Sequence, residues 1–457
     1  MNDYTRQLGE LTASWAPTDR SRTDQLARRA VIDTVAVSLA ALDDPTVTSA
    51  LRALGPGTGG PATVLATGQG GDPGHAALLG GLLGHALDYD DVDDAMIGHP
   101  STVLVPALIA VAEELDLAGD AVLDAFTLGL HVCRDVAGRI GIDEHYAKGW
   151  HSTGTVGTIG ATAALSRLRR LDVDRTRHAL GIAGSLAGGS RQNFGTMTKP
   201  LHAGVAASNA VLATRLAAAG FTADLDQLEA PLGFFALHHG GRASEATPAA
   251  AATGLNVKLY PCCYYIHNAA DAMLELVAAG LRAEDVESVR VTVQPGGLAP
   301  LIHARPTTGL QGKFSLEYAM AAALLDHRLT LRTFTDDQVE RPAAQEFLQR
   351  VDKTESAVPP AGGSADGGFA VVEVQLRSGE RLQRRVDRPR GHATRPVTDD
   401  ELHTKFVDCA AYAGLDPEDA ERVHAGLCRL GPTTSVRAAL RPLRELVHGR
   451  ATAGTPA

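Results

Sequence analysis

The sequence predicts a mainly α-helical protein, with one large all-helical domain and an inserted α+β lid domain that carries a small antiparallel sheet. Apolar residues recur at helical spacing through residues 1–268 and again through residues 398–457. Between these segments the pattern changes to the alternation of a half-buried strand, as at Val289, Val291 and Val293. We therefore expect the N- and C-terminal segments to form the helical domain and residues 269–397 to form the lid.

The individual helices and strands follow from local signals. In the first domain, helices are expected at 22–42, 101–114, 121–140, 157–168, 176–186 and 203–219. In the lid, strands are expected near 289–293, 369–376 and 382–386, with a turn at Ser378 and Gly379 and a helix at 313–325. Helices at 401–413 and 417–430 would return the chain to the helical domain.

Composition and charge exclude several classes of protein. The 457 residues, 44% hydrophobic and 21% charged, are typical of a soluble enzyme of two or three domains. The 42 basic and 53 acidic residues give a net charge of −11 without any basic run, which argues against nucleic acid as a partner. No apolar run in the sequence is long enough to cross a membrane. The five cysteines, an odd number, and the lack of a recognisable leader predict a cytoplasmic protein.

The most informative segment is 195–204, in which Lys199, Pro200 and His202 lie close together between two glycines. Because Pro200 disfavours a helical backbone at the residue before it, the Lys199 side chain should leave from a loop or a helix entrance. A cation held there, beside the N–H groups of a helix N-terminus, is suited to binding an anion. The alternative is a solvated lysine beside a packed histidine.

Two further segments place a histidine at a turn marked by Gly or Pro, just before a helix of small residues. His99 precedes Pro100, and His151 lies between Gly149 and Gly154. Imidazole titrates near neutral pH and is therefore able to take and return a proton. Each histidine has an ordinary structural interpretation, but three such turns in one chain favour function.

Together these segments resemble the MmgE/PrpD family, whose members include 2-methylcitrate dehydratase, cis-aconitate decarboxylase and iminodisuccinate epimerase. The resemblance also extends through residues 84–101, 257–263 (VKLYPCC) and 313–318 (KFSLEY). It implies an all-helical domain with an α+β lid, a homodimer, and a site that uses neither a metal nor another cofactor.

The resemblance further implies catalytic roles for His99, His151, Lys199, Lys258 and Tyr318. The two histidines would lie near the substrate α-carbon, the two lysines would face its carboxylates, and the tyrosine hydroxyl would reach it from the lid. Positive charge would also stabilise an enolate-like intermediate. We expect these five residues to converge on one pocket. Substrate-binding or supporting roles are expected for Asp88, Asp91, Arg191, Asn193, His202 and Cys263.

An acidic run precedes His99 and comprises Asp88, Asp90, Asp91, Asp93 and Asp94. Clustered carboxylates suit a hard cation such as Mg²⁺, and a solvated helix end is a second interpretation. The resemblance favours a metal-free arrangement in which Asp88 and Asp91 orient neighbouring groups. A carboxylate beside an imidazole fixes its tautomer and raises its pKa. We expect no metal here.

Three positions depart from the patterns of named family members. Cys263 stands where cis-aconitate decarboxylases have a histidine, and a thiol cannot imitate an imidazolium. Asp90 stands where methylcitrate dehydratases tend to have Asn, and Val92 where Thr is common. The neighbouring thiols of Cys262 and Cys263 are expected to be small buried groups and not nucleophiles. These departures leave the substrate open.

The sequence thus predicts an enzyme that abstracts a proton α to a carboxylate of a small di- or tricarboxylic acid. A lyase, either a dehydratase or a decarboxylase, is expected. An epimerase of a dicarboxylate such as iminodisuccinate is the alternative, because acid/base groups on opposite faces of a substrate would invert a carbon centre. A non-catalytic protein that keeps the fold is the second alternative. The Gly-rich segment 68–74 lacks a Walker Lys-Ser/Thr pair and is expected to be a surface loop.

Overall fold

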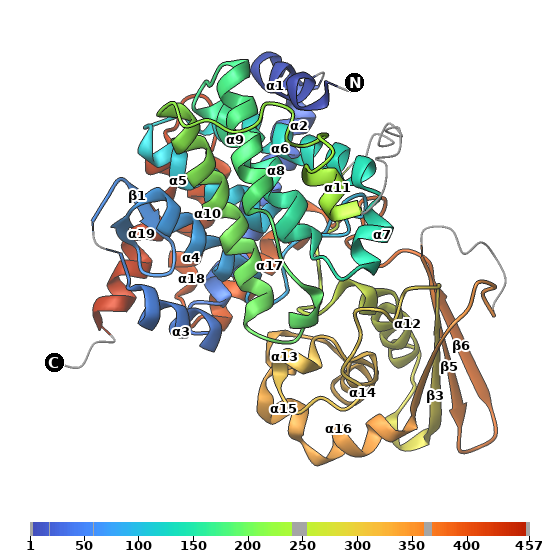
Figure 1. Ribbon diagram of the computed structural model, residues 1–457. Helices are drawn as coiled ribbons and strands as arrows, with labels where there is room; N and C mark the ends of the chain where they lie inside the picture. The colour runs from blue at the N-terminus through green and yellow to red at the C-terminus, as the bar shows by residue number, and fades with distance from the viewer. Residues whose placement is uncertain (1–2, 18, 58, 240–253, 361–367, 454–457) are drawn as a thin grey trace. The chain divides into compact units, whose positions relative to one another are not determined.

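A computed structural model describes residues 3–17, 19–57, 59–239, 254–360 and 368–453 (Figure 1). The chain divides into two compact units. Unit 1 comprises Met1–Gln192, Lys199–Asn256 and Thr398–Ala457, and unit 2 comprises Asn193–Thr198 and Val257–Val397. Apart from the short segment Asn193–Thr198, unit 2 is one continuous stretch of chain, which begins at Val257 and ends at Val397.

Unit 1 is mainly helical, and its helices include all eight that the sequence predicts for the helical domain. Each of these eight begins and ends within a few residues of the expected position, except that the helices expected from residues 157 and 203 each begin five residues earlier, at Ser152 and Thr198. The helices are α1 (Tyr4–Ser14), α2 (Arg20–Ala40), α3 (Pro45–Leu54), α4 (Pro73–His85), α5 (Ser101–Glu114), α6 (Gly119–Ile140), α7 (Ile142–Ala147), α8 (Ser152–Leu168), α9 (Val173–Leu186), α10 (Thr198–Ala218), α11 (Phe234–His239), α17 (Asp399–Tyr412), α18 (Pro417–Cys428) and α19 (Val436–Ala453).

The expectation of an all-helical domain needs one correction. Strands β1 (Ala62–Val64) and β2 (Gln69–Gly71) form a short antiparallel hairpin in unit 1. The Gly-rich segment 68–74, expected to be a plain loop, supplies β2 and then the N-terminus of α4, where the Asp72 carboxylate accepts the Gly74 N–H. Two three-residue strands are too short for alternation to reveal them.

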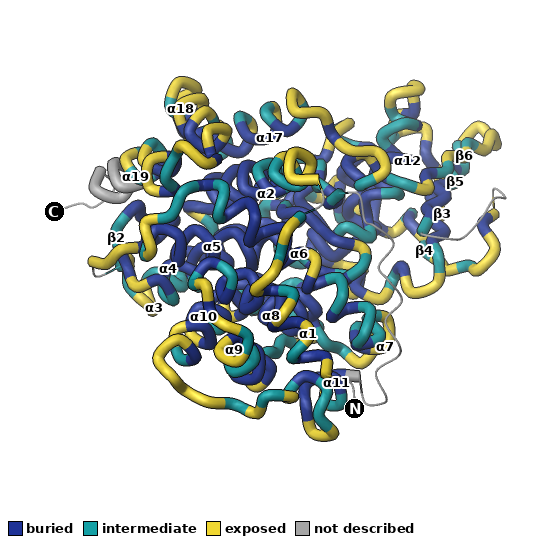
Figure 2. The backbone as a smooth tube through the Cα atoms, turned by 90° about the horizontal axis from the view of Figure 1, so that it is seen from above, coloured by how far each residue is buried: buried dark blue, intermediate teal, exposed yellow. Residues whose placement is uncertain are grey.

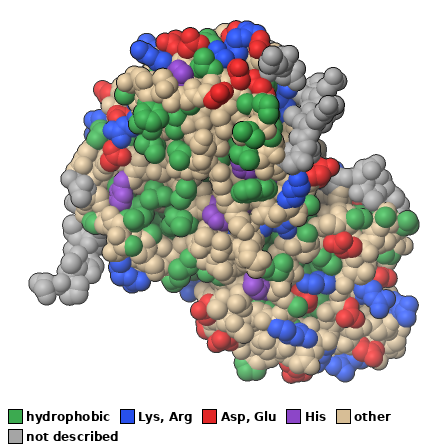
Figure 3. All heavy atoms as spheres, viewed as in Figure 1, with side chains coloured by type: hydrophobic (Ala, Val, Ile, Leu, Met, Phe, Trp, Pro, Cys, Tyr) green, Lys and Arg blue, Asp and Glu red, His purple; other side chains and the backbone are tan. Residues whose placement is uncertain are grey.

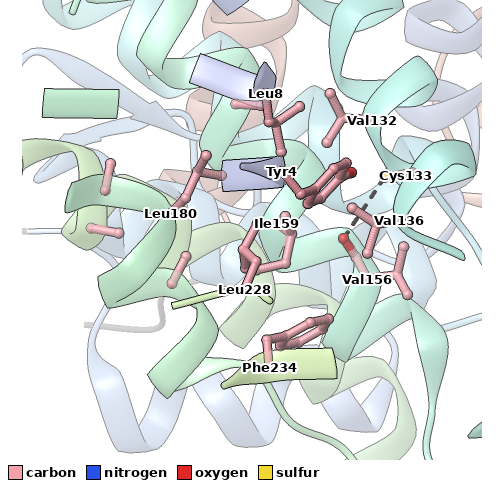
Figure 4. Close-up of a cluster of buried hydrophobic side chains, with 14 of the residues drawn as sticks. Tyr4, Leu8, Val132, Cys133, Val136, Val156, Ile159, Leu180, Leu228 and Phe234 are labelled. Carbon is pink, nitrogen blue, oxygen red and sulfur yellow. Dashed lines mark hydrogen bonds between the residues drawn. The ribbon is translucent and has the colours of Figure 1, made fainter. Parts of the chain in front are cut away.

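The core of unit 1 depends on small residues that let helices approach closely. Helices α5, α6 and α8 pack together and are dark blue, meaning buried, in Figure 2. Between α6 and α8, a Cβ added to Gly160 would lie only 2.2 Å from the Cys133 sulfur, so glycine is required at this contact. Cys133 belongs to a cluster of buried apolar side chains that also includes Tyr4, Ile159 and Phe234 (Figure 4). This packing holds the ends of α4, α5 and α8 in fixed positions.

Unit 2 is an α+β structure built on a four-stranded sheet with the strand order β4-β3-β5-β6. Helices α12 and α14 pack against its strands. The strands are β3 (Val286–Val293), β4 (Val351–Glu355), β5 (Ala370–Leu376) and β6 (Arg381–Val386), and the helices are α12 (His267–Ala278), α13 (Gly309–Gly312), α14 (Leu316–Asp326), α15 (Asp336–Glu340) and α16 (Pro342–Phe347).

The sheet is mixed, whereas the sequence predicted an antiparallel one. Strands β3, β5 and β6 pair antiparallel as expected, but β4 pairs parallel to β3, with Val351 opposite Val289. The sequence of β4, VDKTE, contains one apolar residue. An edge strand pairs with a neighbour on one side only, and charged residues on it prevent pairing with other chains. Its pattern therefore carries no strand signal.

The surface agrees with a net acidic chain. On the face drawn in Figure 3, the described Lys and Arg side chains are interspersed with Asp and Glu and do not form one continuous basic surface. Among the residues that the structure describes, no helix combines the length and the apolar composition that crossing a membrane requires.

Candidate active site

Four helix ends bring candidate acid/base and cationic groups together inside unit 1. His85 is the last residue of α4, His99 lies two residues before α5, and His151 is the N-cap of α8. Lys199 is the second residue of α10, so its side chain leaves from a helix entrance, but its backbone is helical, contrary to the expectation from Pro200. The ring centroids of His99 and His151 are 6.4 Å apart, so one small substrate spans both.

The centre of this cluster is the buried carboxylate of Asp90, which lies between two imidazoles. Its two oxygens are each 2.9 Å from Nδ1 of His85, and one of them is 3.2 Å from Nδ1 of His99. Nδ1 of His99 is also 3.0 Å from the Asp91 carbonyl oxygen. Because every one of these partners is an acceptor, Nδ1 is the protonated nitrogen of both rings, and Nε2 of each ring carries the lone pair.

The protonation states of His85 and Asp90 follow from their burial and from the groups beside them. Burial lowers the pKa of His85 to about 3, and the attraction of Asp90 only partly offsets that effect. Burial alone would raise the pKa of Asp90, but the adjacent His85 and His99 rings outweigh it and hold that pKa well below the usual range. The pair is therefore a neutral imidazole beside an ionised carboxylate. Nε2 of His85 is buried and has no hydrogen-bond partner among the described residues.

A buried ion pair lies beside His85, Asp90 and His99. The Lys199 ammonium is 2.7 Å from Oδ1 of Asp88, and both side chains are almost fully buried. The same Asp88 oxygen lies 3.8 Å from Nε2 of His99. Asp88 has a left-handed backbone with φ of 51°, a conformation that Asp tolerates better than most residues. Lys199 thus places a fixed positive charge next to the imidazoles.

His151 is paired with a second histidine. Its Nδ1 is 3.0 Å from Nδ1 of His202, so one ring donates and the other accepts. Burial and then the charge of Lys199 lower both pKa values, that of His202 to about 4 and that of His151 well below its ordinary range. Gly189, with φ of 135°, makes room for the pair: a Cβ there would lie 3.2 Å from the His202 ring. Both rings are therefore neutral near pH 7.

A second layer supports the acidic segment from below. The Ser101 hydroxyl donates to the Asp91 carboxylate at the start of α5. The Lys405 ammonium, from α17, is 2.7 Å from Oδ1 of Asp33 on α2 and 2.9 Å from the Tyr89 carbonyl oxygen. Burial raises the pKa of Asp91 well above its ordinary value, and the nearby Asp33 charge adds to the rise. Asp91 thus lies buried at the start of α5, held by the Ser101 hydroxyl.

The other members of the acidic run have structural partners. Asp93 pairs with Arg134 at 2.7 Å and caps the Met96 N–H, and Asp94 accepts the Asn256 side-chain N–H. Four of the five carboxylates are buried, namely Asp88, Asp90, Asp91 and Asp93. The interpretation of this run as a solvated helix end is therefore wrong.

His85, Asp88, Asp90 and His99 also have the donor types of a metal site. Ligand atoms of His85, Asp88, Asp90 and His99 all lie within 4.8 Å of one another. However, the Lys199 ammonium already neutralises Asp88, and the imidazole N–H groups already bind Asp90. A divalent cation would have to displace these partners and face the lysine charge.

Arg191 and Asn193, two expected carboxylate contacts, lie in the short 3₁₀ segment Arg191–Asn193. The Arg191 guanidinium stacks 3.6 Å above the Tyr146 ring and donates to the Tyr146 carbonyl. The Asn193 carbonyl accepts the Thr196 N–H. These contacts give both residues local structural roles in the described state.

The remaining candidates belong to unit 2. Lys258 is fully buried. The backbone N–H of Cys263 donates to the Lys313 carbonyl, and the Lys313 ammonium donates back to the Pro261 carbonyl, so the 257–263 segment is held from both sides. The Tyr318 hydroxyl donates to the Thr333 carbonyl in the interior of the unit. That contact gives Tyr318 a structural role in unit 2.

Sequence reasoning missed His85, Asp90 and Lys405 as members or supports of the cluster. His85 ends an apolar helix and Asp90 lies within an acidic run, so neither has a distinctive pattern of its own. The five-residue spacing between them was the available signal, since it allows a helix-terminal imidazole to meet a carboxylate in the following turn. Lys405 comes from the far end of the sequence, and no local pattern links it to residues 33 and 89.

The fold and the cluster define a helical protein whose buried neutral imidazoles, carboxylate and ammonium are equipped to move a proton beside an anionic group. The family model described as the MmgE/PrpD N-terminal domain matches residues 6–247, and the one described as the MmgE/PrpD C-terminal domain matches residues 260–426. The chain belongs to the MmgE/PrpD family.

Several curated relatives are named as decarboxylases. Mouse cis-aconitate decarboxylase is 30% identical over 359 residues, which cover 73% of this chain and 71% of the mouse protein. The human cis-aconitate decarboxylase is 29% identical over 357 residues, covering 73% and 72%. A cis-aconitate decarboxylase of Aspergillus terreus is 24% identical over 422 residues, covering 85% and 84%. These names support an enzyme of the lyase type.

Proposed function

We propose that this protein is a lyase that moves a proton at the carbon next to a carboxylate of a small di- or tricarboxylic acid. The observation that supports the proposal most is the bridging of His85 and His99 by Asp90, beside the Asp88–Lys199 pair. This arrangement combines neutral bases with one fixed cation. The names of the relatives favour decarboxylation of an unsaturated tricarboxylate such as cis-aconitate. The proposal also includes dehydration, the other lyase reaction that the same groups could catalyse.

The proposed division of labour follows from the geometry of each group. Nε2 of His99 and the neutral ring of His151 exchange the proton with the substrate carbon. The Asp91 carbonyl fixes the tautomer of His99, and the contact with His202 fixes the orientation of His151. His85 and Asp90 fix the orientation of His99 and stabilise it when it becomes protonated. Lys199 binds a substrate carboxylate and stabilises the negative charge that develops next to it.

The two lyase reactions use these groups in different directions. In a decarboxylation, the bond between carbon and a carboxylate breaks, CO₂ leaves, the electron pair moves into the neighbouring unsaturated acid, and a histidine passes to carbon a proton that it takes up from solvent. In a dehydration, a neutral imidazole takes the proton from carbon, and the hydroxyl group leaves as water after receiving a proton. In each case one proton is transferred at carbon and the charge is neutralised by Lys199.

We further propose that the reaction needs no metal, because Lys199 supplies the positive charge that a cation would bring to Asp88.

Lys258 is proposed as a second carboxylate-binding cation, a role that a Lys258→Met variant tests through the Michaelis constant. The homodimer is likewise a proposal; light scattering tests it and should give twice the chain mass of 47.7 kDa.

Proton NMR in D₂O, with a panel of citrate, methylcitrate, cis-aconitate and iminodisuccinate, tests the proposed function. A lyase should produce new vinyl signals or consume existing ones, with deuterium at the carbon next to a carboxylate. Deuterium exchange without net conversion, together with inversion of configuration, would instead identify an epimerase. Absence of any change with the whole panel, in a folded preparation, would contradict the proposal.

A further inference from the structure

A second group of titratable side chains lies on the outer face of unit 1, away from the acid/base cluster. His403 on α17 and the residues Glu421, His424 and Cys428 on α18 come together there. Glu421, His424 and Cys428 occupy positions i, i+3 and i+7, so they line one face of α18. Helices α17 and α18 pack against each other, which brings His403 to the same place.

The contacts within this group are close. Nε2 of His403 is 2.8 Å from Oε1 of Glu421, and the rings of His403 and His424 have centroids 4.6 Å apart. The Cys428 sulfur is 3.8 Å from both ring nitrogens of His424. Ligand atoms of the two histidines and the glutamate all lie within 4.8 Å of one another.

We propose that His403, Glu421, His424 and Cys428 bind one divalent transition-metal ion of the zinc class. Two imidazoles, one carboxylate and one thiolate are the donor types that Zn²⁺ takes in tetrahedral sites. Bond lengths of that geometry put nitrogen and sulfur ligands about 3.6 Å apart, close to the 3.8 Å between His424 and Cys428. The donors are nitrogen, oxygen and sulfur, which suits a borderline ion better than the hard cations Mg²⁺ or Ca²⁺.

The protein supports these ligands from behind. The His424 ring packs against the fully buried Phe406 ring at 5.2 Å, which restricts its orientation. Binding of the ion would replace the direct 2.8 Å contact between His403 and Glu421, so that the two ligands separate around it.

The ion would add a link between α17 and α18, which already pack against each other. Helix α17 also carries Lys405, the ammonium group that braces Asp33 and the Tyr89 carbonyl. Binding at His403 and α18 would therefore stabilise the folded state, by an amount that grows with the logarithm of the free ion concentration. Nothing in this inference depends on the reaction proposed above.

Titration with Co²⁺, an optical substitute for Zn²⁺, tests the site in the full-length chain prepared without a polyhistidine tag and freed of metal by a chelator. One equivalent should bind and give a thiolate-to-cobalt absorption band. Cys428 is the exposed cysteine of the chain, whereas Cys133, Cys262, Cys263 and Cys409 are buried. The acid/base cluster contains no thiol, so an ion bound there would give no such band.

Three variants and one control complete the test. Cys428→Ser should remove the band, and Glu421→Gln and the double variant His403→Ala/His424→Ala should weaken binding by about 100-fold or more, since loss of an outer-shell partner alone costs about 10- to 100-fold. His327→Asn, which removes an exposed imidazole elsewhere and suits its left-handed backbone, should bind as the wild type does. Zn²⁺ should raise the thermal unfolding midpoint of the wild type and of His327→Asn, but not that of the double variant. Unchanged affinity in the double variant, or binding to the wild type without a thiolate band, would overturn the proposal.

Discussion

The Lys405 ammonium lies 2.7 Å from the Asp33 carboxylate in the interior of unit 1, although the two residues come from opposite ends of the chain. This contact ties α17 to α2 directly below the acidic segment, because the same ammonium donates to the Tyr89 carbonyl. The C-terminal part of the chain therefore completes the support of the candidate active site.

Removing the Lys405 charge should destabilise the protein strongly. A Lys405→Met variant leaves Asp33 buried without its counter-charge, and breaking a buried pair in this way costs about 3–5 kcal/mol. Urea unfolding measures the loss. The double variant Asp33→Asn/Lys405→Met should recover much of the stability, and Arg422→Ala, which breaks the exposed pair with Asp419, should change little. Equal, small losses in all three variants would show that the buried pair is not a structural brace.

Substitution of His151 or Lys199 should abolish most turnover, and circular dichroism checks that each variant is folded, since Lys199→Ala also leaves the buried Asp88 without its counter-charge. His151→Ala removes a proposed proton-transfer group and should reduce kcat by about 10²- to 10⁴-fold. Lys199→Ala should also raise KM, since it loses a charge-assisted contact with a substrate carboxylate. His75→Gln, which alters a histidine bound to the Gly55 carbonyl on the same unit, serves as the matched control and should keep wild-type kinetics. Near-normal turnover in either site variant would refute the assigned roles.

His85 was not expected from the sequence, and its role has a separate test. In His85→Asn, an amide N–H replaces Nδ1 as the donor to Asp90, but the second ring nitrogen is lost. If His85 stabilises protonated His99 through Asp90, kcat should fall by about 10²-fold with little change in KM. Steady-state kinetics and circular dichroism measure both effects. A variant with unchanged kcat would limit His85 to packing.

Much of the fold was predictable from the sequence, and the reasons for the exceptions are physical. The helices around α5, α6 and α8 have long apolar patterns and clear ends, so their positions were predicted. Strand β4 was missed because an exposed edge strand has no alternation. Within the site, His99, His151 and Lys199 were marked by Gly and Pro at their turns. His85 and Lys405 were missed because only tertiary packing brings them to Asp90 and Asp33.

The buried histidines should make stability depend on pH in a defined direction. Burial first, and nearby positive charge second, lower the pKa of His151 in the folded state, whereas in the unfolded chain it binds a proton below about 6.5. The unfolded state then holds more protons, so this contribution is present above pH 6.5 and is lost as the pH falls. Between about pH 7 and pH 5, the wild type should lose more unfolding free energy than His151→Gln. An equal loss in both proteins would contradict a neutral His151.

Chelation should leave the proposed lyase activity unchanged. Lys199 holds the position beside Asp88 at which a cation would otherwise balance the carboxylates. After exhaustive dialysis against EDTA, kcat and KM on the true substrate should equal those of the untreated enzyme. Loss of activity that a single divalent ion restores would assign the His85, Asp88, Asp90 and His99 group to metal binding instead.

The most direct test of the central claim is the fate of the proton at the substrate carbon. In D₂O, with the substrate that the panel identifies, the wild-type enzyme should place or exchange one deuterium at the carbon next to a carboxylate during each turnover, as proton NMR measures. His151→Ala should reduce the rate of deuterium incorporation and the rate of product formation by the same factor, about 10²-fold or more. Product that forms without deuterium at that carbon, or equal rates in the variant and the wild type, would contradict an imidazole-driven proton transfer.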